Sequence, residues 1–222
     1  MRPPVRLGLL TEGRVLPEPP LDARKRRAII ELLRRAWAEV QGDLTPDLYE
    51  PDVTTRLVLR VNNLLRRTDR TVRAKAIVNS ASDNANTVPI TGRPLIPDIQ
   101  LNLRDPSAPL SVEAKLLGAG RTIGEYCGKD GMRAFVSGEY GWERREGMML
   151  GYVRDGSTLG GTLLPRLETL KTKRGDPLHQ RACGVPTLDG EVDSVHERSG
   201  LMVPETQIPL GEITLWHVWL VA

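Results

Sequence analysis

Cysteine is scarce in this sequence and long apolar runs are missing, and each absence excludes a class of protein. The chain of 222 residues has 2 cysteines, Cys127 and Cys183, which stand far apart without a CxxC pair or a His-rich tract. Neither a disulfide framework nor a zinc site is therefore expected. No run of about 18 apolar residues occurs, and the beginning lacks the pattern of a secretory signal, so we expect a cytoplasmic protein without membrane association.

Two common catalytic signatures are also missing. The stretch GKDGMRAF (128–135) contains glycines but lacks the G-x-x-x-x-G-K-[ST] spacing of a phosphate-binding loop. No G-x-S-x-G turn is present, so hydrolysis by a serine nucleophile has no support. His217 stands in an apolar run and is expected to be a buried core histidine rather than a catalyst.

The formal net charge of +3 is small, but the basic residues gather in the first two helical stretches. Basic stripes of this kind can neutralise phosphates, although a solvated helix face explains either stripe equally well when it is taken alone. The residues expected to contact nucleic-acid phosphates are Arg56, Arg60, Arg67, Lys129 and Arg133.

The order of apolar patterns predicts an α/β protein of the α+β type, with a mixed central sheet flanked by helices. Residues 1–21 are predicted to be an N-terminal arm, and residues 22–222 a single domain. Apolar residues at helical spacing follow a plausible N-cap at Asp22. Helices are predicted at 22–42, 51–67, 122–141 and 163–173, and strands at 72–78, 98–103, 110–117, 147–153 and 213–222.

Three charges interrupt the apolar alternation of the two runs within 93–117. Side chains in a strand alternate between faces, so Asp98 lies opposite in direction to Ile99, and Glu113 and Lys115 share a face. All three charges can therefore lie on one side of a hairpin. A turn centred near residue 107 would place Asp98 opposite residues 115 and 116, with Glu113 as its diagonal neighbour.

These residue types suit a metal site. The carboxylates of Asp98 and Glu113, with the backbone carbonyl of Ala114, make a hard oxygen site for Mg²⁺, and Mn²⁺ is expected to substitute. A metal there would lower the pKa of a bound water, which Lys115 could orient or help to deprotonate. The alternative is an edge hairpin whose solvated face carries an ordinary salt bridge.

Pro97-Asp98 followed by Glu113-Ala114-Lys115 resembles the PD-(D/E)xK nuclease superfamily, also called restriction-endonuclease-like. The core of that family is a helix, a three-stranded meander with the motif, a helix and a further strand, and residues 43–153 follow this order. Many members add an acid from the helix before the meander. Glu50 is the best match for that acid, followed by Asp52 and Glu31. A carboxylate that favours a helix N-terminus explains Glu50 equally well.

The resemblance implies a Mg²⁺-dependent deoxyribonuclease that hydrolyses phosphodiester bonds without a covalent intermediate, with a role in prokaryotic phage defence or restriction. It also implies a targeting or regulatory protein partner, or assembly as a homo-oligomer. Two alternatives stay open. The chain could be a non-catalytic assembly subunit with the same fold, or a basic module that binds nucleic acid without cleaving it.

Overall fold

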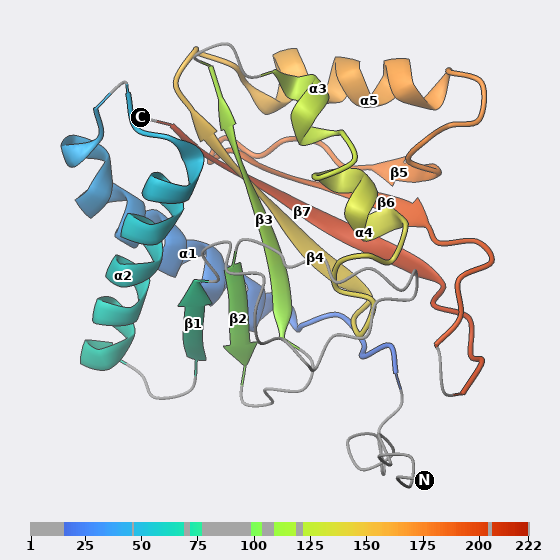
Figure 1. The fold of residues 1–222 in the computed structure, drawn as a ribbon, viewed down its shortest axis with the longest axis horizontal. Helices are drawn as coiled ribbons and strands as arrows, with labels where there is room; N and C mark the ends of the chain where they lie inside the picture. The colour runs from blue at the N-terminus through green and yellow to red at the C-terminus, as the bar shows by residue number, and fades with distance from the viewer. Residues whose placement is uncertain are drawn as a thin grey trace, which may run out of the picture.

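A computed structural model describes residues 16–45, 47–68, 72–76, 99–103, 109–118, 122–203 and 206–221. For 67–68, 72–76, 100, 102 and 103 the description covers the backbone alone. The strands of this part form one seven-stranded sheet in the order β1-β2-β3-β4-β7-β6-β5 (Figure 1). Their bounds are β1 Val72–Ala76, β2 Ile99–Leu103, β3 Leu110–Leu117, β4 Glu146–Val153, β5 Gln180–Cys183, β6 Glu191–Glu197 and β7 Glu212–Val221.

The centre of the sheet is parallel and its margins are antiparallel. β3, β4 and β7 run in the same direction, whereas β1 and β2 on one side and β6 and β5 on the other alternate in direction. Parallel strands need both faces covered, and all eight residues of β4 are buried. The predicted mixed sheet with flanking helices is therefore confirmed.

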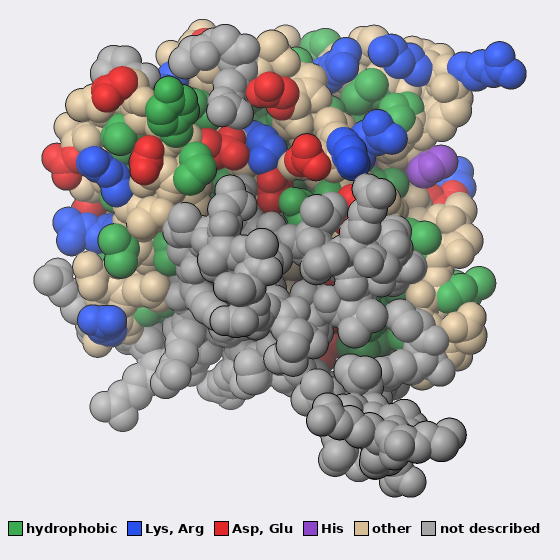
Figure 2. Space-filling model, viewed as in Figure 1, with side chains coloured by type: hydrophobic (Ala, Val, Ile, Leu, Met, Phe, Trp, Pro, Cys, Tyr) green, Lys and Arg blue, Asp and Glu red, His purple; other side chains and the backbone are tan. Residues whose placement is uncertain are grey.

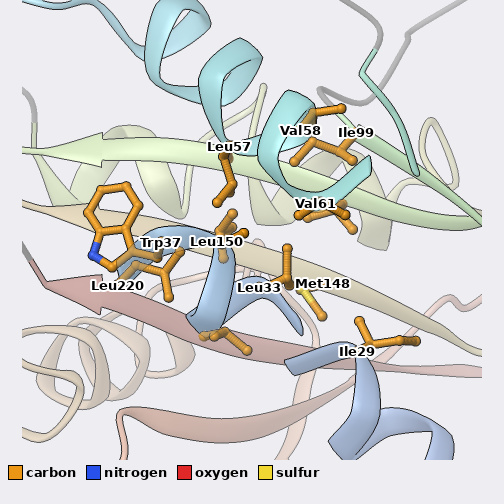
Figure 3. Packing of buried hydrophobic residues seen from close by; sticks show 14 of the residues in the cluster. Ile29, Leu33, Trp37, Leu57, Val58, Val61, Ile99, Met148, Leu150 and Leu220 are labelled. Carbon is orange, nitrogen blue, oxygen red and sulfur yellow. The ribbon is translucent and has the colours of Figure 1, made fainter. Parts of the chain in front are cut away.

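Two long helices cover one face of the sheet. They are α1 (Ala23–Val40), which the short helix η2 (Gln41–Asp43) follows, and α2 (Glu50–Thr68). The Asp22 carboxylate accepts a hydrogen bond of 2.9 Å from the Lys25 backbone N–H, which confirms the predicted N-cap. Figure 3 shows the apolar stripes of both helices meeting side chains of β2, β4 and β7.

The opposite face carries α3 (Ile123–Tyr126), α4 (Met132–Val136), the π-helical turn η3 (Leu159–Leu163) and α5 (Leu164–Lys171). The prediction of one helix at 122–141 was wrong, because a tight turn separates α3 from α4. A Cβ atom on Gly131 would lie 2.2 Å from the Tyr126 carbonyl oxygen, so this position tolerates no side chain. None of the described helices is both long and apolar enough to cross a membrane.

Two strands near the carboxyl end, β5 and β6, were not predicted. Buried and partly exposed residues alternate along β6, with Val192, Ser194 and His196 facing inward. Two of these inward residues, Ser194 and His196, are polar, so the strand lacks the apolar alternation that would predict it. β5 is a four-residue edge strand with a register shift between Gln180 and Ala182, and short edge strands carry little apolar signal.

The predicted register of the β2–β3 hairpin was also wrong. A turn centred near residue 107 would pair Ile99 with residue 115, but the structure pairs Ile99 with Val112 and Leu101 with Leu110. The hairpin is therefore centred between residues 105 and 106. A shift of the centre changes each cross-strand pair, since the turn sets the register.

A buried chain of hydrogen bonds joins α3, β6 and β7. The Ser194 hydroxyl lies 2.7 Å from His196 Nε2 and 2.7 Å from His217 Nε2. His196 Nδ1 lies 2.8 Å from the Leu178 carbonyl oxygen, and Tyr126 Oη lies 3.0 Å from His217 Nδ1. A carbonyl only accepts, so His196 Nδ1 carries a proton, Ser194 donates to His196, and His217 Nε2 donates to Ser194.

Both histidine rings are neutral in this arrangement. It confirms the prediction that His217 is a core histidine, because the residue is fully buried and both ring nitrogens have partners. The Ser194 hydroxyl bridges His217 to His196. His196 and His217 lie close together because β6 pairs with β7.

Replacement of Ser194 by alanine tests the importance of this chain of hydrogen bonds. The variant leaves His196 Nε2 and His217 Nε2 buried without the hydroxyl, which should lower the free energy of unfolding by about 2–3 kcal/mol. Urea unfolding at neutral pH measures the loss. Ser199→Ala, at an exposed serine, is the matched control and should change stability by less than about 0.5 kcal/mol; equal losses in the two variants would contradict the assignment.

Acid should destabilise the protein through the same histidines. Burial lowers the pKa of His196 to about 4 and that of His217 to about 3, whereas an unfolded histidine has a pKa of about 6.5. The unfolded state therefore binds protons first as the pH falls below about 6.5, and stability is lost until the folded pKa values are reached. Between about pH 7 and pH 5 the loss is about 2 kcal/mol for each histidine.

Two buried carboxyl groups act in the opposite sense and define the control. Burial raises the pKa of Glu143 to about 7 and also raises the pKa of Glu146, so these groups favour the folded state as the pH falls. Glu143→Gln removes the stabilising proton uptake of Glu143. Between pH 7 and pH 5 the variant should therefore lose about 2 kcal/mol more of its unfolding free energy than the wild type loses. A parallel pH dependence of the two proteins would contradict this account.

Candidate active site

The candidate site lies at the edge of β3, beyond the point where β2 begins. Ile99, the first residue of β2, pairs with Val112, so the following residues of β3 extend past the start of the described neighbouring strand. The amino-terminal end of α2 contacts β3 at this place through Glu50. Three separate parts of the chain, β2, β3 and α2, therefore meet there (Figure 1).

Glu113 and Lys115 stand on the same face of β3, as their spacing predicts. The Glu113 side chain is 3% exposed and that of Lys115 is 13% exposed, with Lys115 Nζ 2.5 Å from Glu113 Oε1. Both side chains are directed to the face covered by α3 and α4, because Val112, Ala114 and Leu116 pack into the core under α1 and α2. Glu113 is therefore a buried carboxylate, so the alternative of an ordinary salt bridge is right about the ion pair with Lys115 but wrong about its solvated face.

Glu50 reaches the pair from the first residue of α2. Its Oε1 lies 3.3 Å from Lys115 Nζ, and its Oε2 accepts a hydrogen bond of 2.8 Å from the Leu116 backbone N–H. Both carboxylate oxygens thus contact β3, and Oε2 occupies the position that a carbonyl of a neighbouring strand would take. Glu50 is the acid that the structure brings to Lys115, whereas Asp52 and Glu31 are exposed.

Arg154 holds the segment before α2 against the end of the sheet. Its Nη1 donates a hydrogen bond of 3.1 Å to the Leu48 carbonyl, and its backbone N–H donates one of 2.9 Å to the Leu117 carbonyl. These bonds connect the end of β4, the end of β3 and the residues that precede Glu50. Sequence reasoning missed Arg154, although an arginine directly after the buried apolar run of β4 was a visible signal.

The backbone of β3 indicates where the Ala114 carbonyl lies. The Leu117 carbonyl is directed toward β4, where it accepts from Arg154, and the Leu116 N–H is directed to the other edge, toward Glu50. Residues two apart in a strand direct their backbone groups to the same edge, so the Ala114 carbonyl shares the edge with Leu116 and Glu50. Its expected role as an oxygen ligand is consistent with this position.

Two carboxylates are the groups that could hold a divalent cation here. The Lys115 ammonium lies within 3.3 Å of one oxygen from each of Glu50 and Glu113, and carboxylate oxygens are the hard donors that Mg²⁺ prefers. No group of three or more His, Cys, Asp or Glu side chains with metal-binding geometry occurs among the described residues. Asp98, the third predicted acid, lies outside that part of the chain.

The basic candidates fall into two groups. On α2, Arg56 donates a hydrogen bond of 3.1 Å to the Asp43 carbonyl, and Arg60 forms an ion pair with Glu39; the side chain of Arg67 lies outside the described residues. Lys129 precedes α4 and Arg133 lies on it, and both side chains are exposed. Figure 2 shows Lys and Arg side chains on the face that carries α3, α4 and α5.

Arg144, which stands two residues before β4, is buried. It is 4% exposed, and its guanidinium pairs with Glu18 at 3.3 Å and with Glu146 at 3.1 Å. Glu18 and Arg144 also form a backbone bridge. These contacts fasten residues that precede α1 to the beginning of β4, so Arg144 has a structural role.

Comparison of the chain with protein-family models, curated proteins and solved structures gave no match. The functional interpretation therefore depends on the motif and on the contacts of Glu50, Glu113 and Lys115. Those contacts bring together residues that stand 65 and 2 positions apart in the sequence.

Proposed function

We propose that this protein is a Mg²⁺-dependent nuclease that hydrolyses phosphodiester bonds in DNA and acts in prokaryotic phage defence or restriction. The observation that carries the proposal is the position of the Lys115 ammonium between the carboxylates of Glu113 and Glu50. One acid of α2 meets an acid and a lysine of β3 at one strand edge, which is the set of groups that the resemblance to the PD-(D/E)xK superfamily leads us to expect.

The order of the elements supports a restriction-endonuclease-like core. α2 precedes the antiparallel strands β1, β2 and β3, the short helices α3 and α4 follow, and β4 returns parallel to β3. In this proposal α1 and the residues after β4 are additions to that core. The helices and strands from α2 to β4 follow the order of the PD-(D/E)xK superfamily, which the motif resembles.

Asp98 supplies the third carboxylate in the proposal. It is bonded to Ile99, whose partner in the sheet is Val112, the residue before Glu113. Cross-strand neighbours lie about 5 Å apart, which is a separation that one cation can bridge. The proposal therefore expects Asp98 to lie near Glu113, and the described pair of Ile99 with Val112 is consistent with that expectation.

Each residue of the site has a proposed role in the reaction. Asp98, Glu113 and the Ala114 carbonyl hold the cation, and Glu50 completes the acidic set. A Mg²⁺ or Mn²⁺ ion held there would supply Lewis-acid chemistry for the phosphate and the attacking water. Lys115 would orient that water, which gives one proton to solvent as its oxygen bonds to phosphorus, while the bridging P–O bond breaks and the leaving oxygen takes a proton from solvent.

The proposed DNA path crosses the face of α3 and α4. Lys129 and Arg133 are exposed there, on the same side of the sheet as Glu113. Contacts with phosphates supply affinity without sequence information, so a targeting or regulatory protein partner or a homo-oligomer would supply selectivity. The arginines of α2 have partners within the protein and are the second choice for phosphate contacts.

Cleavage of supercoiled plasmid in Mg²⁺ tests the proposed chemistry. Asp98→Asn, Glu113→Gln and Lys115→Met should each lower the cleavage rate at least about 100-fold, since each removes a group that contacts the metal or the reacting water. Glu50→Gln should lower it less, by about tenfold, because Glu50 Oε2 is bound to the Leu116 N–H and only Oε1 is directed to the site. EDTA should abolish cleavage by the wild type.

Lys171→Met is the matched control, because Lys171 is an exposed lysine at the end of α5. It should retain wild-type cleavage. A wild type that does not cleave DNA, or a Lys115→Met variant that cleaves at the wild-type rate, would contradict the proposal. Unchanged assembly in that case would favour the non-catalytic subunit.

The proposed DNA path makes a second, separate prediction. Lys129→Glu combined with Arg133→Glu should weaken binding of a labelled duplex in EDTA at least about tenfold and reduce the dependence of log Kd on log[salt] by about two. Fluorescence anisotropy at several salt concentrations measures both effects. Arg56→Glu combined with Arg60→Glu is the comparison pair, and a greater loss in that pair would move the DNA to the α2 side.

A further inference from the structure

Lys115 is held as a cation between two acids that belong to different elements. Its Nζ lies 2.5 Å from Glu113 Oε1 and 3.3 Å from Glu50 Oε1. The side chains of Glu50 and Lys115 are 12% and 13% exposed. Water therefore screens these charges weakly, and the two carboxylates share one positive charge inside the protein.

A divalent cation and the ammonium compete for the same oxygens. Two positive ions held between one pair of partly buried carboxylates would repel each other strongly at a separation of about 4 Å. The lysine side chain has a flexible four-carbon stem, so it can leave. The carboxylate of Glu50 stays in place, because its Oε2 is bound to the Leu116 N–H at 2.8 Å.

We infer that Lys115 is a resident cation that a divalent metal displaces from between Glu50 and Glu113. The inference deepens the proposed function and depends on it. In the metal-free protein the ammonium offsets one of the two negative charges and holds the two carboxylates in a geometry suited to a cation. Metal binding transfers those oxygens to the metal and releases the ammonium, which then lies beside the metal as the positively charged group that can meet the water or the phosphate.

The effect of removing Lys115 on metal affinity distinguishes a displaced cation from a lysine that acts only in the reaction. A lysine that assists the reaction without bonds to the metal ligands opposes the metal only through charge repulsion that water and salt screen, so its removal raises metal affinity only slightly. A resident cation opposes metal binding, because its hydrogen bonds to Glu50 and Glu113 must be broken first. Removal of Lys115 should therefore raise the affinity for metal and abolish cleavage in the same variant.

Titration with Mn²⁺ in the absence of DNA tests this consequence. Lys115→Met should bind Mn²⁺ at least about tenfold more tightly than the wild type, a difference of about 1.4 kcal/mol, by isothermal calorimetry or electron paramagnetic resonance. Lys171→Met should match the wild type. Equal or weaker binding by Lys115→Met overturns the exchange, and the proposed nuclease survives that result if the wild type binds Mn²⁺ and cleaves DNA. A wild type that neither binds Mn²⁺ nor cleaves overturns both.

A second measurement uses the wild-type protein and does not depend on the folding of a variant. Acetic anhydride labels free lysine amines, and mass spectrometry gives the labelling rate at each lysine. Saturating Mn²⁺ should increase the rate at Lys115 at least about threefold and leave that at Lys171 unchanged, because the displaced amine loses its two carboxylate partners. A Lys115 rate that stays constant or falls while Mn²⁺ binds overturns the exchange.

Discussion

The parallel pairing of β3, β4 and β7 determines the positions of Glu113 in the candidate site and of the buried His217. Both faces of these strands are covered, so their registers fix the side chains from row to row. One row runs from Glu113 through Met149 to His217. Adjacent strands are about 4.8 Å apart, which places the candidate metal site and the buried histidine chain on the same face about 10 Å from each other. A slip of one residue in either pairing would turn one of the two groups to the opposite face and separate them.

The burial of Glu113 requires a physical explanation. A carboxylate that is 3% exposed is costly, and a buried ion pair is often no more stable than apolar residues of similar volume. An apolar residue at position 113 would suit the core beside Met149 equally well. Stability alone thus gives no reason for a carboxylate and an ammonium at this strand edge, whereas a cation site gives one. The same argument applies to Glu50, which replaces a backbone acceptor at the Leu116 N–H.

Sequence reasoning predicted the elements whose signals are local. The apolar stripes of α1 and α2, the apolar runs of β4 and β7, and the common face of Glu113 and Lys115 follow from periodicity within one segment. It failed where distant contacts decide the outcome: the β2–β3 register, the break at Gly131 beside the Tyr126 carbonyl, and the strands β5 and β6. Glu50 could be named as a candidate from the order of elements, but its approach to β3 depends on Arg154 and Leu48, which are 106 positions apart.

The additions to the proposed nuclease core, α1 and the strands after β4, contribute to its stability. Arg26 of α1 pairs with Asp193 of β6 and lies 4.8 Å from the centre of the Trp216 ring, and Arg34 pairs with Glu191. These arginines belong to a stripe that the sequence alone could assign to phosphate binding, yet they connect the first helix to the last strands. β7 covers the edge of β4 along eight residue pairs, so a core without it would expose a long edge strand. The position of Lys115 therefore depends on strands far from the motif, since β4 is held between β3 and β7.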